Sequence, residues 1–162
     1  MPFKQLDALL QQVVAAQREQ AEHPRIVVVD DDPGMRRSLE TLLRGLYQVV
    51  LASSATEGVA AVDGDTCAVV LDIKMKGYDG FWASTEIRKK YPDVPIIFYS
   101  AWQDLKDPYA VINEHHPFGY LTKDGDTARL LDMLESAVRM HRMTLYNKKL
   151  VDGLLRARRE EG

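Results

Sequence analysis

Cys67–Gly80, which reads Cys-Ala-Val-Val-Leu-Asp-Ile-Lys-Met-Lys-Gly-Tyr-Asp-Gly, decides how the rest of the chain is arranged. Its first five residues form a short apolar run that ends at the carboxylate of Asp72, and a polar loop with glycine follows. Such a run predicts a buried parallel strand, and open α/β sheets keep their binding sites at the carboxyl ends of their strands. We therefore expect Asp72 to be a functional side chain at one edge of a sheet.

Apolar runs alternate with helical patterns on both sides of this stretch. The predicted strands are 26–29, 47–52, 67–71, 95–99 and 118–121, and the predicted helices between and after them are 33–46, 55–62, 81–91, 108–116 and 127–159. Strands that alternate with helices pair in parallel through right-handed crossovers. The sequence therefore predicts a doubly wound α/β fold, with a five-stranded parallel sheet of the flavodoxin-like order 2-1-3-4-5 and helices on both faces.

Both ends of the chain carry helical patterns that such a sheet does not need. Residues 1–22 place apolar side chains at steps of three and four, which predicts an amphipathic helix that Pro24 ends. The last helical pattern continues well past the length that would cover the sheet. We expect three parts: an N-terminal helix (1–23), a central domain (24–140) and a C-terminal helical extension (141–162).

Two interpretations of the C-terminal extension stay open. Met143, Leu150 and Leu154 approximate one edge of a heptad seam, which Asn147 and Lys148 interrupt. One interpretation is a short coiled coil or a pairing with the N-terminal helix, and the other is a solvated tail.

Composition excludes several classes of protein. The 162 residues are 46% apolar and carry a net charge of −3, which is ordinary for a globular chain. A single cysteine, Cys67, excludes an intrachain disulfide, and we find neither a signal peptide nor a membrane-spanning stretch. The basic residues of the last helix are spread around it rather than clustered. We expect a cytoplasmic protein that contacts neither a membrane nor nucleic acid directly.

Polar side chains stand at the ends of four predicted strands. Asp30 and Asp31 end the first, Asp72 the third and Ser100 the fourth, and Lys123 follows the fifth. In a parallel sheet these side chains converge on one edge, where crowded carboxylates repel one another unless a cation intervenes. Oxygen ligands suit Mg²⁺, and a lysine with a hydroxyl suits phosphate oxygens. The constellation predicts phosphoryl transfer to a carboxylate nucleophile.

On these residues the chain resembles the receiver domain of two-component response regulators. The matching stretches, which together extend over about Arg25–Arg139, are Val27–Asp32, Leu71–Met75, Asp79-Gly80, Tyr99–Ala101 and Gly119–Lys123. The resemblance implies that Asp72 accepts a phosphoryl group from a sensor histidine kinase or a phosphotransfer protein. It also implies a downstream protein partner or a homodimer, formed through the helix after the fourth strand, the fifth strand and the last helix.

The same resemblance assigns the other site residues. Mg²⁺ would be held by Asp30, Asp31, Asp72 and the main-chain carbonyl of Lys74, with Asp30 acting largely through water. The phosphoryl oxygens would contact Ser100, Ala101 and Lys123. The switch would involve Ser100 and Tyr120. Three residues set this chain apart. Asp124 stands where receivers usually carry proline, and the bulky Lys74 and Trp102 occupy positions expected to shield the phosphoaspartate.

Two other functions compete with the receiver. A pseudo-receiver would act as an interaction module without phosphorylation. A phosphatase of the haloacid-dehalogenase kind would use Asp30 as nucleophile, in the spacing Asp30-x-Asp32, but Gly34 stands where that family requires threonine or valine. The nucleophile, Asp72 or Asp30, separates the receiver from the phosphatase.

Overall fold

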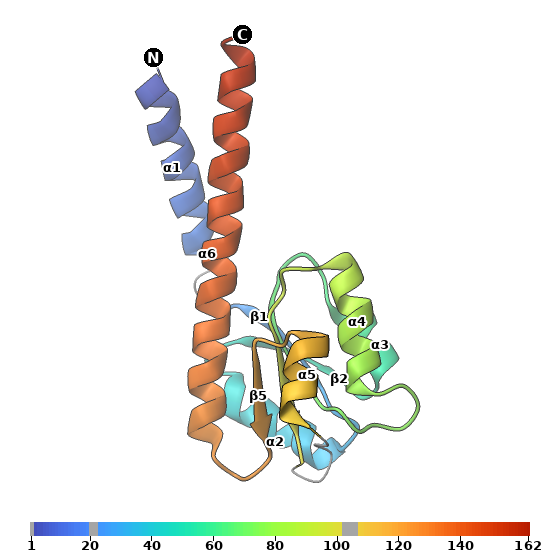
Figure 1. The fold of residues 1–162 in the computed structure, drawn as a ribbon. Helices are drawn as coiled ribbons and strands as arrows, with labels where there is room; N and C mark the ends of the chain where they lie inside the picture. The colour runs from blue at the N-terminus through green and yellow to red at the C-terminus, as the bar shows by residue number, and fades with distance from the viewer. Residues whose placement is uncertain (1, 20–22, 102–106) are drawn as a thin grey trace.

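The computed structural model describes residues 2–19, 23–101 and 107–162 (Figure 1). Its elements follow in the order α1 (Pro2–Glu19), β1 (Arg25–Val29), α2 (Pro33–Leu43), β2 (Gln48–Ala52), α3 (Ala55–Ala61), β3 (Thr66–Leu71), α4 (Gly80–Lys90), β4 (Ile96–Ser100), α5 (Pro108–His115), β5 (Gly119–Thr122) and α6 (Thr127–Glu160). None of the helices in these ranges combines the length and apolar character needed to cross a bilayer.

The five strands form one parallel sheet in the order β2-β1-β3-β4-β5, which confirms the predicted topology. In the inner strand β1, Val28 is in register with Leu51 of β2 and with Val70 of β3. Successive side chains of a strand point to opposite faces. Ile26 and Val28 accordingly pack in a cluster with residues of α2 and α6, whereas Val27 and Val29 pack with α3, α4 and α5. Because helices cover both faces, β1 and β3 are continuous apolar runs after their first residues, Arg25 and Thr66.

Side-chain caps begin the helices where the sequence places aspartate. Asp32 accepts a hydrogen bond from Gly34 N at the start of α2, and Asp107 accepts one from Tyr109 N at the start of α5. In both helices proline occupies the first turn, as predicted. The prediction that α2 reaches Leu46 was wrong. The helix ends at Leu43, and Leu46 lies in the following turn with 55% of its surface exposed.

The terminal helices lie side by side and run in opposite directions (Figure 1). The contact is close at Gly153 of α6, where an added Cβ would come within 2.2 Å of the Leu9 side chain. Val13 is buried in this arrangement, while Phe3 is exposed. The pairing interpretation therefore holds for this structure, and the solvated tail does not. The predicted helix over 1–22 is confirmed over Pro2–Glu19, and residues 20–22 lie outside the described residues.

Gly80 fixes the geometry of the loop between β3 and α4. Its backbone N–H donates to Ile73 O at 2.7 Å, which brings the start of α4 against the residue that follows Asp72. A Cβ at position 80 would lie 2.1 Å from the backbone oxygen of Asp72 and 2.9 Å from Ile73 Cα. Only glycine lets α4 begin so close to the end of β3.

We predict that Gly80→Ala lowers the free energy of unfolding by about 1–3 kcal/mol or more, because the clash is with backbone atoms that cannot rotate away. Urea denaturation measures this loss. Gly64→Ala is the matched control, since a Cβ there meets nothing within 4 Å, and its unfolding midpoint should stay near that of the wild type. Equal midpoints for the two variants would contradict this account of the loop.

Candidate functional site

The predicted polar residues gather at the carboxyl edge of the sheet. Asp30 and Asp72 directly follow β1 and β3, Ser100 ends β4, and Lys123 follows β5. Carboxylate oxygens of Asp30, Asp31 and Asp72 all lie within 4.8 Å of one another. Asp30 and Asp72 are buried, with exposed fractions of 2% and 6%, while Asp31 is half-buried. The structure thus brings together the three acids that the sequence placed at the ends of two strands.

Lys123 supplies the positive charge inside this acidic cluster. Its ammonium lies 2.6 Å from Asp30 Oδ2 and 3.2 Å from Asp72 Oδ2. Burial raises the pKa of the Asp72 carboxyl group and the charge of Asp30 raises it further, while Lys123 and Ser100 partly oppose both. Burial alone would lower the pKa of the Lys123 amine, but the hydrogen bonds and charges of the two carboxylates raise it. One cation therefore serves two buried anions.

Asp72 is held by its other oxygen. Asp72 Oδ1 accepts hydrogen bonds from the Ser100 hydroxyl and from Ile73 N, both at 2.9 Å. Ser100 itself is fully buried. The carboxylate is therefore fixed in orientation, with Oδ1 toward the protein and Oδ2 toward Lys123.

Sequence reasoning missed three backbone contacts that shape the site. Lys76 N donates to Asp31 Oδ2 at 3.1 Å, which joins the loop after β3 to the end of β1. Arg36 donates to the carbonyl oxygen of Asp30 at 2.7 Å, and Asp32 N donates to Asp30 Oδ1 at 2.9 Å. The two contacts that backbone N–H groups donate cannot be recognised in a sequence. The contact from the Arg36 side chain could have been, because Arg36 lies in the first turn of the helix that follows the acidic run.

The remaining predicted residues lie around this cluster. Lys74 is exposed and Ala101 is half-buried directly after Ser100. The ring of Tyr120 is half-buried, 6.5 Å from the ring of Phe98, and its hydroxyl oxygen is shielded from solvent. Trp102, expected to shield the phosphoaspartate, lies outside the described residues.

The side chain of Asp124, which stands where receivers usually carry proline, makes its hydrogen bond within its own loop. Its Oδ1 accepts a hydrogen bond from Asp126 N at 2.9 Å, and its backbone N–H donates to Thr122 O at 2.9 Å. The peptide bonds of residues 107–162 are all trans. Lys123 nevertheless reaches the cluster, so proline is not needed to position it. The extra carboxylate caps the loop at exposed positions and makes no ion pair with Lys123.

The donor atoms of the cluster fit a hard divalent cation. All are carboxylate oxygens, which Mg²⁺ prefers over nitrogen or sulfur ligands. Three carboxylates against one lysine leave uncompensated negative charge, which a divalent ion would offset. Asp31 is half-buried, so the cluster is open to solvent on one side.

A family model described as the response regulator receiver domain matches residues 26–135. The chain belongs to this family. The receiver is 31% identical over 115 residues to the transcriptional regulatory protein GlrR of Escherichia coli K12, covering 70% of this chain and 26% of GlrR. It is 34% identical over 121 residues to ZraR of Salmonella typhimurium LT2, covering 74% and 27%. The chain thus spans about a quarter of the length of these curated relatives.

Solved receiver structures share the fold. A response regulator receiver domain from Clostridium thermocellum has a TM-score of 0.68 at 26% identity, covering 74% of this chain and 98% of that one. The response regulator TrrA of Thermotoga maritima has a TM-score of 0.62 at 29% identity, covering 70% and 97%, and its structure is a complex with Mg²⁺–BeF.

We predict that Mg²⁺ raises the melting temperature of the receiver, because a ligand that binds only the folded state stabilises it by mass action. A concentration a hundredfold above the dissociation constant contributes about 2.7 kcal/mol. Chelation with EDTA should reverse the shift in differential scanning fluorimetry.

Asp31→Asn should reduce this Mg²⁺-dependent shift, since it removes one carboxylate without touching the Lys123 ion pairs. Asp32→Asn is the matched control, because asparagine caps a helix as well as aspartate and Asp32 lies outside the cluster. An equal shift in both variants would show that Asp31 does not take part in the site.

Proposed function

We propose that this receiver accepts a phosphoryl group on Asp72, with Mg²⁺ held by Asp30, Asp31, Asp72 and the main-chain carbonyl of Lys74. The observation that carries the proposal is the position of the Asp72 carboxylate. It is buried at the sheet edge with Ser100 Oγ at 2.9 Å and Lys123 Nζ at 3.2 Å, beside two further acids. A carboxylate nucleophile with a hydroxyl and an ammonium within reach matches phosphoryl transfer.

The transfer forms one bond and breaks another. A carboxylate oxygen of Asp72 attacks phosphorus while the phosphorus–nitrogen bond of the donor phosphohistidine breaks, and the product is an aspartyl phosphate with a free imidazole. Mg²⁺, when bound, offsets the negative charge of the phosphoryl oxygens and of the carboxylates. Lys123 exchanges its contact with Asp72 for a phosphoryl oxygen, and its pairing with Asp30 keeps the ammonium at the site.

The switch follows from the hydrogen bonds that transfer removes. Ser100 Oγ now donates to Asp72 Oδ1, and on phosphorylation it donates to a phosphoryl oxygen, as does the backbone N–H of Ala101. Tyr120 lies on the adjacent strand and responds to the new position of Ser100. The local change in charge thereby biases a two-state surface. A sensor histidine kinase or phosphotransfer protein is the proposed donor, and a protein partner reads the change.

We predict that the wild-type protein gains the mass of one phosphoryl group when incubated with acetyl phosphate and Mg²⁺, and that EDTA prevents it. Asp72→Asn should abolish the gain, because the amide is not a nucleophile for phosphorus. Intact mass spectrometry measures both outcomes. An acid-stable gain of mass by the Asp72→Asn variant would argue against the proposal.

Asp30→Asn separates the receiver from the phosphatase. In a receiver this variant slows phosphorylation through weaker Mg²⁺ binding but keeps Asp72 as the acceptor. Phosphate release that depends on Asp30 and not on Asp72 would assign the nucleophile to Asp30. A wild-type protein that binds Mg²⁺ yet gains no mass would be a pseudo-receiver.

A further inference from the structure

The side chain of Arg36 reaches from the first turn of α2 back to the acidic run that precedes the helix. Its Nη1 donates a hydrogen bond to the backbone oxygen of Asp30 at 2.7 Å. Because the donor is a cation, the bond is charge-assisted, and such bonds are shorter and stronger than those between neutral groups. Arg36 is half-buried, whereas its neighbour Arg37 is exposed. The two arginines therefore have different surroundings although they are adjacent in the sequence.

The sheet does not supply a partner for the Asp30 carbonyl. At the end of β1, Val29 O still accepts a hydrogen bond from Asp72 N at 2.9 Å, and Asp30 N donates to Ala52 O at 3.1 Å. The chain then leaves the sheet, and among the described residues only Arg36 donates to Asp30 O. Without this donor the carbonyl would have to rotate toward water, because a backbone carbonyl in the protein needs a hydrogen-bond partner.

The Asp30 carbonyl belongs to the peptide unit that leads into Asp31. This unit is planar, so the orientation of the carbonyl sets the direction in which the chain enters Asp31. The Asp31 carboxylate accepts a hydrogen bond from Lys76 N at 3.1 Å, and it contributes an oxygen to the cluster with Asp30 and Asp72. Rotation of the peptide unit would move the Asp31 carboxylate away from these groups.

Arg36 itself starts from a fixed point. Its backbone N–H donates to Asp32 O at 3.0 Å, in a turn that the Asp32 side chain caps. On the other side, two hydrogen bonds from Ser53 lower the pKa of Glu57 at the start of α3, and the charge of Arg36 lowers it further. The guanidinium therefore lies near the start of α3 as well as at the end of β1.

Arg36 acts on the cluster through this hydrogen bond rather than through its charge. Burial shifts the pKa of Asp72 most, and among neighbouring charges those of Asp30 and Lys123 have the largest effects. Within the described ranges, Arg36 donates to a main-chain oxygen and forms no ion pair with the three acids. Its contribution to the site is therefore the orientation of a peptide unit.

We propose that Arg36 is a positioning residue for Mg²⁺ binding, because it fixes the peptide between Asp30 and Asp31 and thereby holds the Asp31 carboxylate in the cluster. The proposal rests on the proposed function, since it requires that the cluster binds Mg²⁺. In this role Arg36 contacts neither the ion nor the phosphoryl group. Loss of Arg36 therefore weakens Mg²⁺ binding and leaves the transfer step at saturating Mg²⁺ unchanged.

Isothermal titration calorimetry of the full chain with Mg²⁺ tests this role. Arg36→Met keeps an unbranched side chain but removes the donor. It should raise the dissociation constant for Mg²⁺ about tenfold or more, as expected for the loss of one hydrogen bond that a charged group makes. Arg37→Met is the matched control, because Arg37 is the exposed neighbour on the same helix, and it should bind Mg²⁺ like the wild type.

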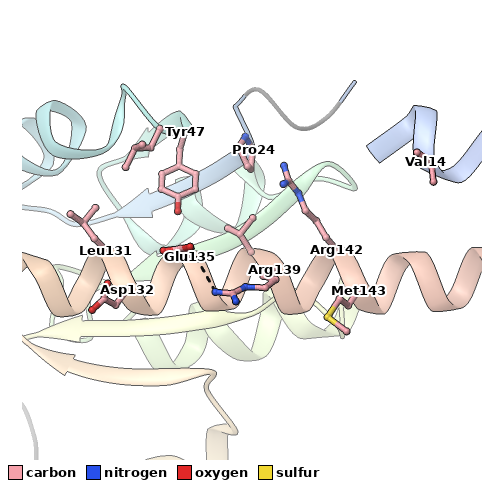
Figure 2. A pocket seen from close by; sticks show the side chains of 11 residues that line it. Val14, Pro24, Tyr47, Leu131, Asp132, Glu135, Arg139, Arg142 and Met143 are labelled. Carbon is pink, nitrogen blue, oxygen red and sulfur yellow. Dashed lines mark ion pairs between the residues drawn. The ribbon is translucent and has the colours of Figure 1, made fainter. Parts of the chain in front are cut away.

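Two further variants separate positioning from net charge and from damage to the fold. Arg139→Met removes the same charge at the amino ends of the strands, where Arg139 lines a groove of about 890 Å³ with Pro24 and Tyr47 (Figure 2). Its affinity for Mg²⁺ should match the wild type, and an equal loss in Arg139→Met and Arg36→Met would overturn the proposal. Arg36→Lys keeps a charged donor and should recover most of the affinity. Urea unfolding in EDTA measures the stability of each variant without the ion.

A double-mutant cycle tests whether Arg36 acts through Asp31. Asp31→Asn removes the carboxylate that Arg36 positions, so adding Arg36→Met to it should change the dissociation constant by less than about twofold. Two effects that multiply would place the action of Arg36 elsewhere and overturn the proposal. With acetyl phosphate as donor, Arg36→Met should raise the Mg²⁺ concentration that gives the half-maximal rate, while the rate at saturating Mg²⁺ stays near that of the wild type.

The wild-type titration separates this proposal from the proposed function. A wild type that binds no Mg²⁺ overturns both. A wild type that binds Mg²⁺, with Arg36→Met binding it equally well, overturns only the role of Arg36 and leaves the proposed metal site in place.

Discussion

The pairing of the Lys123 ammonium with two buried carboxylates is the constraint on which the site depends. Asp30 and Asp72 lie at the ends of the neighbouring strands β1 and β3, so their two carboxylates are close together and repel each other. Lys123 comes from the end of β5, with β4 between it and β3. Its long side chain spans β4 to reach both acids, at 2.6 and 3.2 Å. The charge balance therefore depends on the order β1-β3-β4-β5 within the sheet, which links the fold to the chemistry.

The loops after the strands supply what the strands do not. Gly80 allows α4 to start against the backbone of Asp72, and Lys76 N then reaches Asp31. Ile73 N and Ser100 Oγ fix one oxygen of Asp72, so the carboxylate is oriented before any ligand binds. A carboxylate that is oriented in advance does not have to reorient before it reacts. The departure at Asp124 fits the same logic, because its side chain closes the loop after β5 locally and leaves the direction of Lys123 unchanged.

The sheet order and the convergence of Asp30, Asp72, Ser100 and Lys123 could be predicted, because alternating strands and helices leave few topologies and strand ends meet at one edge. The end of α2 could not. Leu46 continues the helical spacing, but the chain turns at Arg44 and exposes it. The partner of Lys123 was also missed, since burial of Asp30 depends on three-dimensional packing. The pairing of α1 with α6 stayed open because it depends on contacts between distant segments.

Gly153 is a residue whose local helix propensity does not predict the structure around it. In isolation, glycine near the end of a helical pattern indicates a break, because it lowers helix propensity by about 1 kcal/mol relative to alanine. Here α6 continues unbroken to Glu160, and the missing side chain is the space that Leu9 of α1 occupies. Close packing between two helices thus compensates a local preference. α6 begins four residues after Lys123 and runs without a break, so its receiver half and its distal half form one continuous helix of about 51 Å. Any rotation of α6 against the sheet would therefore displace its far end most.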